Sequence, residues 1–376
     1  MPGIIAGMTT SGTTHANAPA PRRPTRLLLV TNMYPTPDRT QTGPFVARRV
    51  ASLRARGVDV VVVGPSSYRR SAALRHLGIA WRALTTRGRF DGVEAHPVYA
   101  AGLLGLVAAR LRRVPLLAYA HGADISDYAT RGLIHRTFAG LVVRHADAIV
   151  ANSSFTAGYV EQLGATARVV SPGVDMAVFL PGPEGPDERR SLREGLGLPE
   201  GLLALYLGTL SERKGADVFA TAIDLASGSG ATPVWVGVML GDGPLAESLT
   251  RSHPSIRQCA PVPADEVAAW IQAADVVAVP SRREPLGLAA AEALACGKPV
   301  VASSVGGLRE IVVEGVNGLV IPPGDPPALA AALDRLRDEE LRARLGAAGP
   351  RSVARHDIRA TAIAMAEVWS ELGVLV

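Results

Sequence analysis

Residues 281–325 have the sequence SRREPLGLAAAEALACGKPVVASSVGGLREIVVEGVNGLVIPPGD. A short apolar run, DVVAVPS (275–281), ends where this stretch begins, and two further runs lie inside it, KPVVAS (298–303) and GLVIPP (318–323). Between the first two runs, Gly287 opens an apolar helical pattern. Short apolar strands separated by helices are typical of a parallel sheet that is buried on both faces.

The same alternation of strands and helices covers most of the chain. Before residue 172 it comprises RLLLVT (26–31), VDVVVVG (58–64), VPLLAYAHG (114–122), DAIVANS (147–153) and ARVVSP (167–172). After residue 200 it restarts with LLALYLG (202–208) and TPVWVGVML (232–240). A chain of 376 residues is also too long for one ordinary core. We therefore expect an α/β protein with two Rossmann-like, doubly wound domains that face a cleft.

Composition marks the domain boundaries. The segment PGPEGPDERRSLREGLGLPEG (181–201) is rich in Pro, Gly and charge, which is typical of a linker. We place a disordered tail at 1–24, the first domain at 25–175, the linker at 176–200 and the second domain at 201–355. A break at Gly349 and Pro350 precedes a C-terminal helix at 356–376, and whether this helix crosses back to the first domain stays open.

Bulk composition excludes several classes of protein. Hydrophobic residues make up 48% of the chain and charged residues 19%, which fits a packed globular protein. The net charge of +5 comes without basic runs interleaved with aromatic residues, so we expect no nucleic-acid binding. Cys259 and Cys296 have neither a metal-ligand spacing nor a disulfide framework, which favours a reducing, cytoplasmic location.

Targeting and membrane segments are not expected either. The N-terminus is polar and rich in proline, and it lacks the basic start and long apolar region of a signal peptide. Arg110, Arg112 and Arg113 interrupt the longest apolar stretch, so the sequence predicts no membrane-spanning helix.

Two glutamates in residues 281–325 are candidates for the reaction. Glu284 lies on the loop after a predicted strand, and Glu292 lies in the helix that Gly287 opens. Their spacing is slightly over two helical turns, so the side chains face broadly the same side if the loop folds back. Such pairs are usually solvated, but LAAAEALAC (288–296) is otherwise apolar, and a carboxylate there needs a partner other than water. The free amides at this helix start suit a phosphate.

Lysine is scarce, because only Lys214 and Lys298 among the 39 basic residues are lysine. Where arginine is the default cation, each lysine is a candidate for a site that needs a compact ammonium. Lys214 follows the strand and loop LYLGTLSERKG (205–215) and opens a helix, where its ammonium can meet a diphosphate. We prefer this interpretation to that of an ordinary surface lysine.

Loops after two strands of the first half hold further candidates. Gly43 ends a loop that is long for a strand-to-helix connection, and it either lets amides approach a phosphate or acceptor or serves as a plain turn glycine. His121 directly follows VPLLAYA (114–120), so it lies at the cleft edge, where a histidine is more often structural than chemical. Asp124 and Asp127 either hold acceptor hydroxyls or cap the next helix.

Several motifs, in order, resemble the retaining glycosyltransferases of family 4, which have a GT-B fold of two facing Rossmann-like domains. These motifs are NMYPTPDRTQTGPFVARRV (32–50), AHGADI (120–125), ADAIVANS (146–153), SPGVD (171–175), LGTLSERKG (207–215), GDGP (241–244), EPLGLAAAEALACGKPVVAS (284–303) and GGLREIVVEGVNGLV (306–320). The family hallmark is a glutamate, seven residues and a second glutamate in the second domain. The resemblance covers nearly all of the chain except the tail.

The resemblance implies roles for the two glutamates and the residues between them. Glu284 would contact hydroxyls of the donor sugar, and Glu292 would contact the ribose. The backbone amides near Leu286, Gly287 and Leu288 would contact the phosphates.

The resemblance also implies roles outside that stretch. His121 would lie beside the donor sugar as a second reaction-centre residue, and Gly43 matches the glycine loop of the family. The family commonly has arginine where this chain has Thr209, so Arg213 is the nearest substitute beside Lys214 for a phosphate contact.

The segment SYRRSAALRHLGIAWRALTTRGRF (67–90) predicts a basic amphipathic helix. Its apolar face and its arginines are Leu74, Leu77, Trp81 and Leu84, and Arg70, Arg75, Arg82 and Arg87. We favour packing of the apolar face on the sheet of the first domain. The alternative is contact with an anionic membrane surface or an acidic acceptor.

We therefore expect transfer of a hexose or modified hexose from a nucleoside diphosphate sugar to an acceptor hydroxyl, with retention of configuration. The first domain would take the acceptor, which is a glycan, a lipid-linked sugar or a small molecule, and the second would take the donor. No D-x-D motif offers a metal site, so we expect neither a metal nor another cofactor, with cationic side chains in place of a divalent ion.

Two rival functions stay open at this point. A nicotinamide-dependent oxidoreductase suits two Rossmann-like halves, but neither GLGLPEG nor GDGPLAE has the third glycine of G-x-G-x-x-G in place. A non-catalytic sugar-binding protein of the same fold would not need Glu284, Glu292 and Lys214 together.

Overall fold

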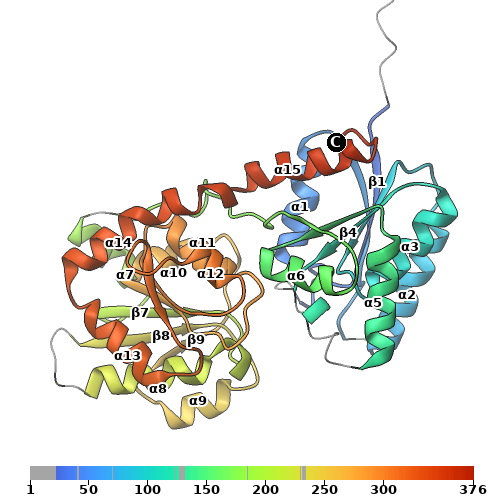
Figure 1. The fold of residues 1–376 in the computed structure, drawn as a ribbon. Coiled ribbons are helices and arrows are strands. Elements are labelled where there is room, and N and C mark those ends of the chain that lie inside the picture. The colour runs from blue at the N-terminus through green and yellow to red at the C-terminus, as the bar shows by residue number, and fades with distance from the viewer. Residues whose placement is uncertain are drawn as a thin grey trace, which may run out of the picture.

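The structure is a computed structural model that describes residues 23–376 except 40–41, 70, 123, 127–131, 184, 229 and 231–233. Nearly all of the expected tail, together with Arg70 and Asp127, therefore lies outside the described residues. Two domains, each built on a parallel sheet with helices on both faces, lie side by side (Figure 1). The predicted fold class is confirmed.

The first sheet has six strands, all paired in parallel. In spatial order they are β2 (Asp59–Val63), β1 (Arg26–Thr31), β3 (Gly92–His96), β4 (Leu116–Ala120), β5 (Ala148–Ala151) and β6 (Arg168–Val169). The strand order reverses between β1 and β3, because β2 lies on the outer side of β1. Open α/β sheets bind ligands at such a reversal, outside the carboxyl ends of the strands.

Alternate residues of β1 face opposite layers of helices, which explains why its sequence is apolar throughout. The helices of this domain are α1 (Pro44–Ala55), α2 (Ala72–Thr85), α3 (Ala101–Arg112), α5 (Leu133–His145) and α6 (Ser154–Gln162). Leu27 and Leu29 pack with α1 on one face. Leu28 and Val30 pack with α2 and α3 on the other, and α5 extends this layer over β4 and β5.

The sequence pattern does not predict β3, and it does not predict the three-residue β9 (Arg257–Cys259). All five residues of β3 are buried, but the sequence GVEAH contains Glu94 and His96. Polar residues inside a fully buried strand break the apolar run by which strands are recognised.

The second sheet also has six parallel strands. In spatial order they are β12 (Gly318–Ile321), β11 (Val300–Ser303), β10 (Val276–Val279), β7 (Leu202–Leu207), β8 (Trp235–Leu240) and β9. The strand order reverses between β10 and β7, which predicts a second ligand-binding edge. Its helices are α7 (Pro186–Gly195), η1 (Glu212–Lys214), α8 (Ala216–Gly228), α9 (Ala246–Ser252), α10 (Val267–Ala273), α11 (Leu288–Ala295), α12 (Leu308–Ile311), α13 (Pro326–Arg335) and α14 (Glu339–Ser352).

The segment that we expected to be a linker contains α7. Leu192 and Leu198 pack on the core of the second domain, and Arg193 Nη2 lies 2.8 Å from Asp275 Oδ2. Proline and glycine made this segment look irregular, but its apolar residues are spaced to cover one side of α7.

The expected break at Gly349 and Pro350 is wrong in position, because α14 includes both residues. Pro350 lies in the last turn, where the helix ends two residues later in any case. The chain turns instead at η2 (Ala354–His356), and Asp357 Oδ1 then caps α15 (Ile358–Glu371) by accepting a hydrogen bond from Arg359 N at 2.7 Å.

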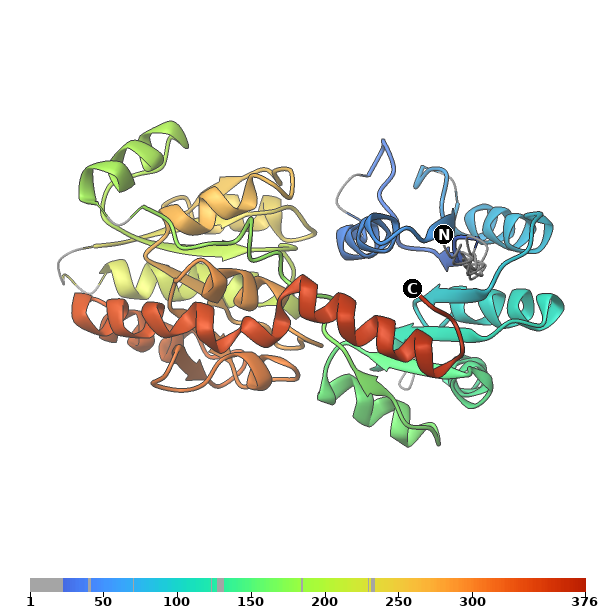
Figure 2. The same ribbon diagram turned by 90° about the horizontal axis from the view of Figure 1, so that it is seen from above.

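Helix α15 leaves the second domain and runs across the first (Figures 1 and 2). Met365, Val368 and Trp369 pack with Leu27 and Leu29 of β1. This C-terminal helix therefore covers part of the face of the first sheet that α1 leaves open.

The favoured packing of the basic amphipathic segment is wrong. The expected apolar face of α2 is directed to solvent, with Leu74 57%, Leu77 66%, Trp81 71% and Leu84 43% exposed. Ile79 and Ala83 instead pack in the core cluster that contains Leu28 and Val30 of β1. No helix among the described residues is both long and apolar enough to span a bilayer.

We predict that Trp369→Ala lowers the free energy of unfolding by about 3 to 5 kcal/mol, because it opens a cavity in the core of the first domain. Trp369 is fully buried. Ile363→Ala is the matched control, since Ile363 lies on the same helix but is 58% exposed. Urea unfolding measures both variants, and equal losses would show that α15 does not contribute to that core.

Candidate active site

The candidate site lies where the carboxyl ends of both sheets meet the cleft between the domains. His121 directly follows β4, η1 with Lys214 follows β7, and the loop with Glu284 follows β10. Because the strands of each sheet are parallel, these loops lie along one edge of each domain.

Lys214 and Glu284 form an ion pair, with Lys214 Nζ 2.6 Å from Glu284 Oε2. Ser281 Oγ donates a hydrogen bond to the same carboxylate oxygen at 3.1 Å. Gly215 has a φ of 71°, and a side chain there would collide with the Pro280 carbonyl. The glycine therefore lets the turn that carries Lys214 approach the end of β10, where the buried carboxylate needs a partner.

Arg213 joins the same two loops through its backbone. Its carbonyl accepts hydrogen bonds from the N–H groups of Arg282 at 2.9 Å and Arg283 at 3.2 Å. The guanidinium of Arg282 binds both carboxylate oxygens of Asp217, at 2.7 and 2.6 Å. A bidentate pair of this kind fixes orientation, so the loops after β7 and β10 are held together without a ligand.

Helix α11 begins at Gly287, as the sequence predicts. Gly287 has a φ of 99°, and a side chain there would collide with Leu308. Leu286 is buried, and the partly buried Leu288 packs against the core of the second domain.

Glu292 is buried on α11 and faces the other domain. Its Oε1 lies 3.6 Å from Nη2 of Arg48 on α1. Burial raises the pKa of Glu292 to about 7, and the charge of Arg48 only partly offsets it. Among the described residues, Arg48 is the charged group within 4 Å of this carboxylate, and the sequence did not indicate it as a neighbour.

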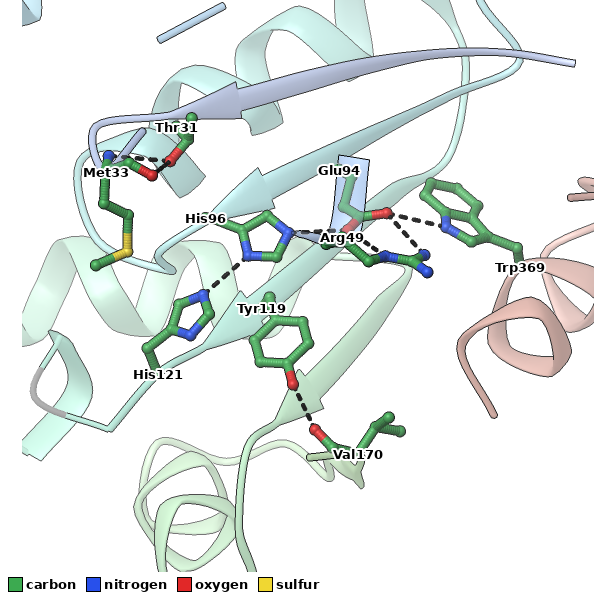
Figure 3. Close-up of polar contacts among 9 residues, drawn as sticks. All are labelled: Thr31, Met33, Arg49, Glu94, His96, Tyr119, His121, Val170 and Trp369. Atoms are coloured by element: carbon green, nitrogen blue, oxygen red, sulfur yellow. Dashed lines mark hydrogen bonds and ion pairs between the residues drawn. The ribbon is translucent and has the colours of Figure 1, made fainter. Parts of the chain in front are cut away.

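Gly43 closes the loop after β1. It has a φ of 67°, and a side chain there would collide with the Met33 carbonyl. Thr31 holds the same residue, because its Oγ1 accepts from Met33 N at 3.0 Å and donates to Met33 O at 3.1 Å (Figure 3). The loop needs glycine for its own close approach, whichever of the two predicted roles Gly43 has.

His121 ends a buried chain of polar side chains (Figure 3). His121 Nε2 lies 2.8 Å from His96 Nδ1, and His96 Nε2 lies 2.8 Å from Glu94 Oε1. Arg49 and Trp369 also bind Glu94. Sequence analysis found only His121, although two polar residues at alternate positions just before Pro97 were a signal for a polar strand end.

Asp124 lies beneath His121. Its Oδ1 accepts a hydrogen bond from the backbone N–H of His121 at 2.9 Å, and its Oδ2 accepts one from Val98 N at 2.9 Å. These contacts join two loops of the first domain and are neither the cap of the next helix nor the acceptor contact that the sequence left open. Asp127, the other tentative acceptor residue, lies outside the described residues.

One cavity at this edge, here called the smaller cavity, has a volume of about 480 Å³. Phe155 and Tyr159 of α6 line it from the first domain, and Arg213, Glu284 and Arg309 line it from the second. It therefore combines aromatic surface, cations and one of the predicted glutamates.

The larger cavity has a volume of about 980 Å³. The loop that ends at Gly43 lines one side, and the ends of β7 and β8 with Thr209 and Asp242 line the other. Arg213 lines both cavities. Within the described residues, neither lining includes Lys214, Glu292 or His121, so the structure does not place these three on the cavity walls.

Lys298, the other lysine, lies away from this edge. It precedes β11, at the amino ends of the strands. Burial lowers its pKa to about 8, with Arg189 acting in the same direction and Asp275 opposing it. Scarcity alone therefore does not identify a cleft residue.

Comparison with known families matches both halves of the chain. Residues 22–178 match the model described as Glycosyltransferase Family 4, and residues 201–339 match the one described as Glycosyl transferases group 1. The D-inositol 3-phosphate glycosyltransferase of Xylanimonas cellulosilytica is 34% identical, with 76% of this chain and 73% of that protein covered. The protein of the same name from Thermobispora bispora is also 34% identical, with 77% and 72% covered.

Solved structures share the fold. Sucrose-phosphate synthase from Thermosynechococcus elongatus superposes with a TM-score of 0.79 at 22% identity, covering 93% of this chain and 99% of that one. Alr3699/HepE from Anabaena, in complex with UDP-glucose, has a TM-score of 0.75 at 21% identity, covering 92% and 99%. Both similarities show the two-domain architecture.

We predict that the free energy of unfolding falls between pH 5 and pH 8, and that Glu292→Gln reduces this fall. The folded-state pKa of Glu292, about 7, lies above its ordinary value of 4.5. The contribution of the protonated carboxyl to the free energy of unfolding is therefore fully present below pH 4.5 and is lost as the pH rises through 7. The removed pH dependence is on the order of 2 to 4 kcal/mol. Urea unfolding at both pH values, with the exposed Glu200→Gln as control, measures it, and an unchanged slope would contradict the assignment.

Proposed function

The chain belongs to the glycosyltransferases of group 1 and family 4, and we propose that it transfers a hexose or modified hexose from a nucleoside diphosphate sugar to an acceptor hydroxyl with retention of configuration. The observation that carries this proposal is the ion pair of the half-buried Lys214 with the buried Glu284, between the loops after β7 and β10. It provides a cation for a diphosphate and a carboxylate for sugar hydroxyls at the same point.

The larger cavity suits the nucleoside diphosphate. It lies at the carboxyl ends of β7 and β8, the position at which sheets of this kind bind nucleotides. Gly208, Gly241 and Gly243 line it, so backbone groups are accessible there. The Anabaena neighbour of the same fold was solved with UDP-glucose, which supports a nucleotide-sugar donor.

The smaller cavity suits the acceptor. Phe155 and Tyr159 offer the aromatic surface against which sugar rings pack, and Ser126 and Ser304 offer hydroxyls. Arg309 adds positive charge, which suits a phosphorylated polyol, and two relatives carry the name D-inositol 3-phosphate glycosyltransferase. We therefore propose an acceptor with several hydroxyl groups, such as a phosphorylated polyol, a glycan or a lipid-linked sugar.

The reaction needs charge neutralisation at the leaving diphosphate, while the sugar gains oxocarbenium character. Arg213 lines both cavities. When the donor binds, Lys214 can leave its contact with Glu284 and bind a phosphate oxygen instead. Glu284 is then free to accept from a sugar hydroxyl. We assign the acceptor proton to the departing phosphate oxygen, and we assign no metal to the reaction.

Two rival functions were compatible with the sequence pattern. The family assignment sets aside a nicotinamide-dependent oxidoreductase. A non-catalytic sugar-binding protein differs from our proposal in one result, which is the turnover of a donor by purified protein. Thermal stabilisation by UDP, GDP and TDP sugars identifies the donor to use, because a ligand that binds the folded state raises the melting temperature.

A second observation concerns where the protein acts. Adjacent helices α2, α3 and α5 expose apolar side chains, here called the apolar face: Leu74, Leu77, Trp81, Leu84, Val107, Leu111, Leu133, Phe138 and Leu141. Exposed arginines lie on or beside the same helices: Arg87, Arg113, Arg136 and Arg144. A surface that combines apolar groups with arginine suits anionic lipid headgroups. We propose that this face rests on the inner surface of the cytoplasmic membrane.

We predict that the two glutamates separate in binding and turnover. If Glu292 contacts the ribose, Glu292→Ala weakens binding of free nucleotide and of whole donor alike, by about 1 to 3 kcal/mol. If Glu284 holds the hexose, Glu284→Ala leaves nucleotide affinity nearly unchanged, because Glu284 does not contact the nucleotide and Lys214 stays available for the diphosphate. The same substitution lowers turnover, because the hexose is no longer held in position.

Calorimetry with the nucleoside diphosphate and turnover of the donor, both in excess EDTA, make this comparison. Equal loss of nucleotide binding in both variants would mean that the pair is misassigned. Activity that returns only with Mg²⁺ or Mn²⁺ would contradict the assignment of the charge to Lys214 and Arg213.

We predict that wild-type protein sediments with vesicles that contain phosphatidylglycerol and not with vesicles of phosphatidylcholine alone. Leu77→Gln with Trp81→Gln should reduce sedimentation at least severalfold, because it removes two side chains from the centre of the α2 surface. Leu225→Gln with Val234→Gln, at exposed apolar positions of the second domain, is the control. Wild-type protein that ignores the anionic vesicles would rule out a membrane role for the apolar face.

A further inference from the structure

The buried polar chain beneath His121 has a feature that the proposed reaction does not explain. Glu94 is completely buried, and so is nearly all of His96. Neither side chain reaches a cavity wall among the described residues. A buried charge is costly unless it has a defined set of partners. The partners of Glu94 therefore indicate which neighbouring side chains it positions.

Four donors converge on the Glu94 carboxylate (Figure 3). Oε1 accepts from Arg49 Nε at 3.2 Å and faces His96 Nε2 at 2.8 Å. Oε2 accepts from Arg49 Nη2 at 3.3 Å and from Trp369 Nε1 at 3.2 Å. An ionised carboxylate can only accept hydrogen bonds. His96 Nε2 must therefore carry a proton, as must the groups of Arg49 and Trp369.

The charge on Glu94 is already balanced by Arg49. Although burial opposes ionisation, Arg49 and then His96 hold the pKa of Glu94 well below its usual range. Within the described residues, Glu94 is the one carboxylate that pairs with His96, so a second positive charge there would have no counterion of its own. His96 is therefore neutral, with its proton on Nε2 and a lone pair on Nδ1.

This tautomer of His96 fixes the next ring. His96 Nδ1 must accept a hydrogen bond, so His121 Nε2, 2.8 Å away, must donate one. Burial lowers the pKa of His121 well below 6.5, so this ring is also neutral. Its other nitrogen, Nδ1, is then unprotonated, and within the described residues it has no hydrogen-bond partner.

The ring of His121 is also held in orientation. Tyr119 stacks on both histidines, with centroid distances of 5.0 Å to His96 and 4.6 Å to His121. Asp124 accepts from the backbone N–H of His121. Stacking fixes the plane of the ring, but it does not choose a tautomer, because both tautomers have the same shape.

We infer that Glu94 is a positioning residue that sets the tautomer of His121 through His96, so that His121 presents an unprotonated Nδ1 to a hydroxyl group of the substrate. The use of Nδ1 rests on the proposed function, in which His121 lies beside the donor sugar. A lone pair on Nδ1 accepts a hydrogen bond from a hydroxyl, whereas an N–H there would have to donate one. Glu94 is not a catalytic residue, because it acts only through His96.

The substitution Glu94→Gln tests the relay, because the three neighbouring side chains differ in what they can do. Arg49 and Trp369 can only donate, but His96 can become an acceptor by changing its tautomer. The glutamine amide group therefore faces fewer fixed donors in the position of Oε1 than in that of Oε2. In that position the amide NH2 group donates to His96 Nε2, so the proton of His96 lies on Nδ1. His121 Nε2 must then accept a hydrogen bond, and the proton of His121 lies on Nδ1.

Long-range ¹⁵N–¹H correlation spectra of the ligand-free protein, labelled in its 8 histidines, report the tautomers. The His121→Gln variant assigns the His121 signals. We expect Nε2–H on His121 in the wild type and Nδ1–H in Glu94→Gln. Trp369→Phe removes one donor from the same carboxylate but keeps it ionised, so it should retain the wild-type tautomer.

If Glu94→Gln does not fold, His96→Phe takes its place. Phenylalanine can keep the stack on Tyr119 but removes the acceptor for His121 Nε2, so the single wild-type tautomer should give way to a mixture. An Nδ1–H signal on His121 in the wild type, or an unchanged tautomer in His96→Phe, would overturn the inference.

Kinetics then test the use of Nδ1. With the donor that gives the largest thermal stabilisation among UDP-, GDP- and TDP-glucose, kcat should fall about 10-fold to 100-fold in Glu94→Gln or His96→Phe. Affinity for the free nucleotide should stay within about twofold, and Trp369→Phe should keep the wild-type kcat. A changed tautomer without a change in kcat would overturn the role of Nδ1. The expected tautomers in a protein that turns over no donor would overturn the proposed function instead and leave the relay intact.

Discussion

Every strand in both sheets is parallel to its neighbours, and this constraint organises the rest of the molecule. Parallel strands need helices on both faces, and in the first domain this cover is completed only by α15, which comes from the far end of the chain. Parallel strands also send all their carboxyl ends to one edge. Residues of the site therefore gather at this edge in each domain, and the two edges face each other across the cleft.

Three of the buried carboxylates near this cleft differ in how completely protein donors pair with them. Glu94 has four close donors and a low pKa. Glu284 has Lys214 Nζ at 2.6 Å and Ser281 at 3.1 Å. Glu292 has one guanidinium at 3.6 Å, and its pKa rises to about 7. Among the described residues, Glu292 therefore has the fewest close protein partners of the three.

Adjacent arginines on α1 divide their work between the two domains. Successive residues of a helix point about 100° apart, so Arg49 turns toward Glu94 in its own domain while Arg48 reaches Glu292 in the other. On the far side of the cleft, Glu310 accepts from the backbone N–H groups of Ser154 and Phe155. The domains therefore meet through polar contacts, which can exchange with water more readily than an apolar interface can.

The sequence alone determined the fold class, ten of the twelve strands and the pairing of a helix start at Gly287 with a buried Glu292, because these follow from local periodicity and from the cost of an isolated charge. Tertiary structure decided what local patterns cannot encode, which is the set of partners that come from distant segments. The strand with Glu94 and His96 was missed because its polar residues are stabilised by Arg49 and by Trp369, which lies 275 residues away. The direction of the apolar side of α2 was likewise decided by packing, since periodicity shows that a helix has two faces but not which of them meets the sheet.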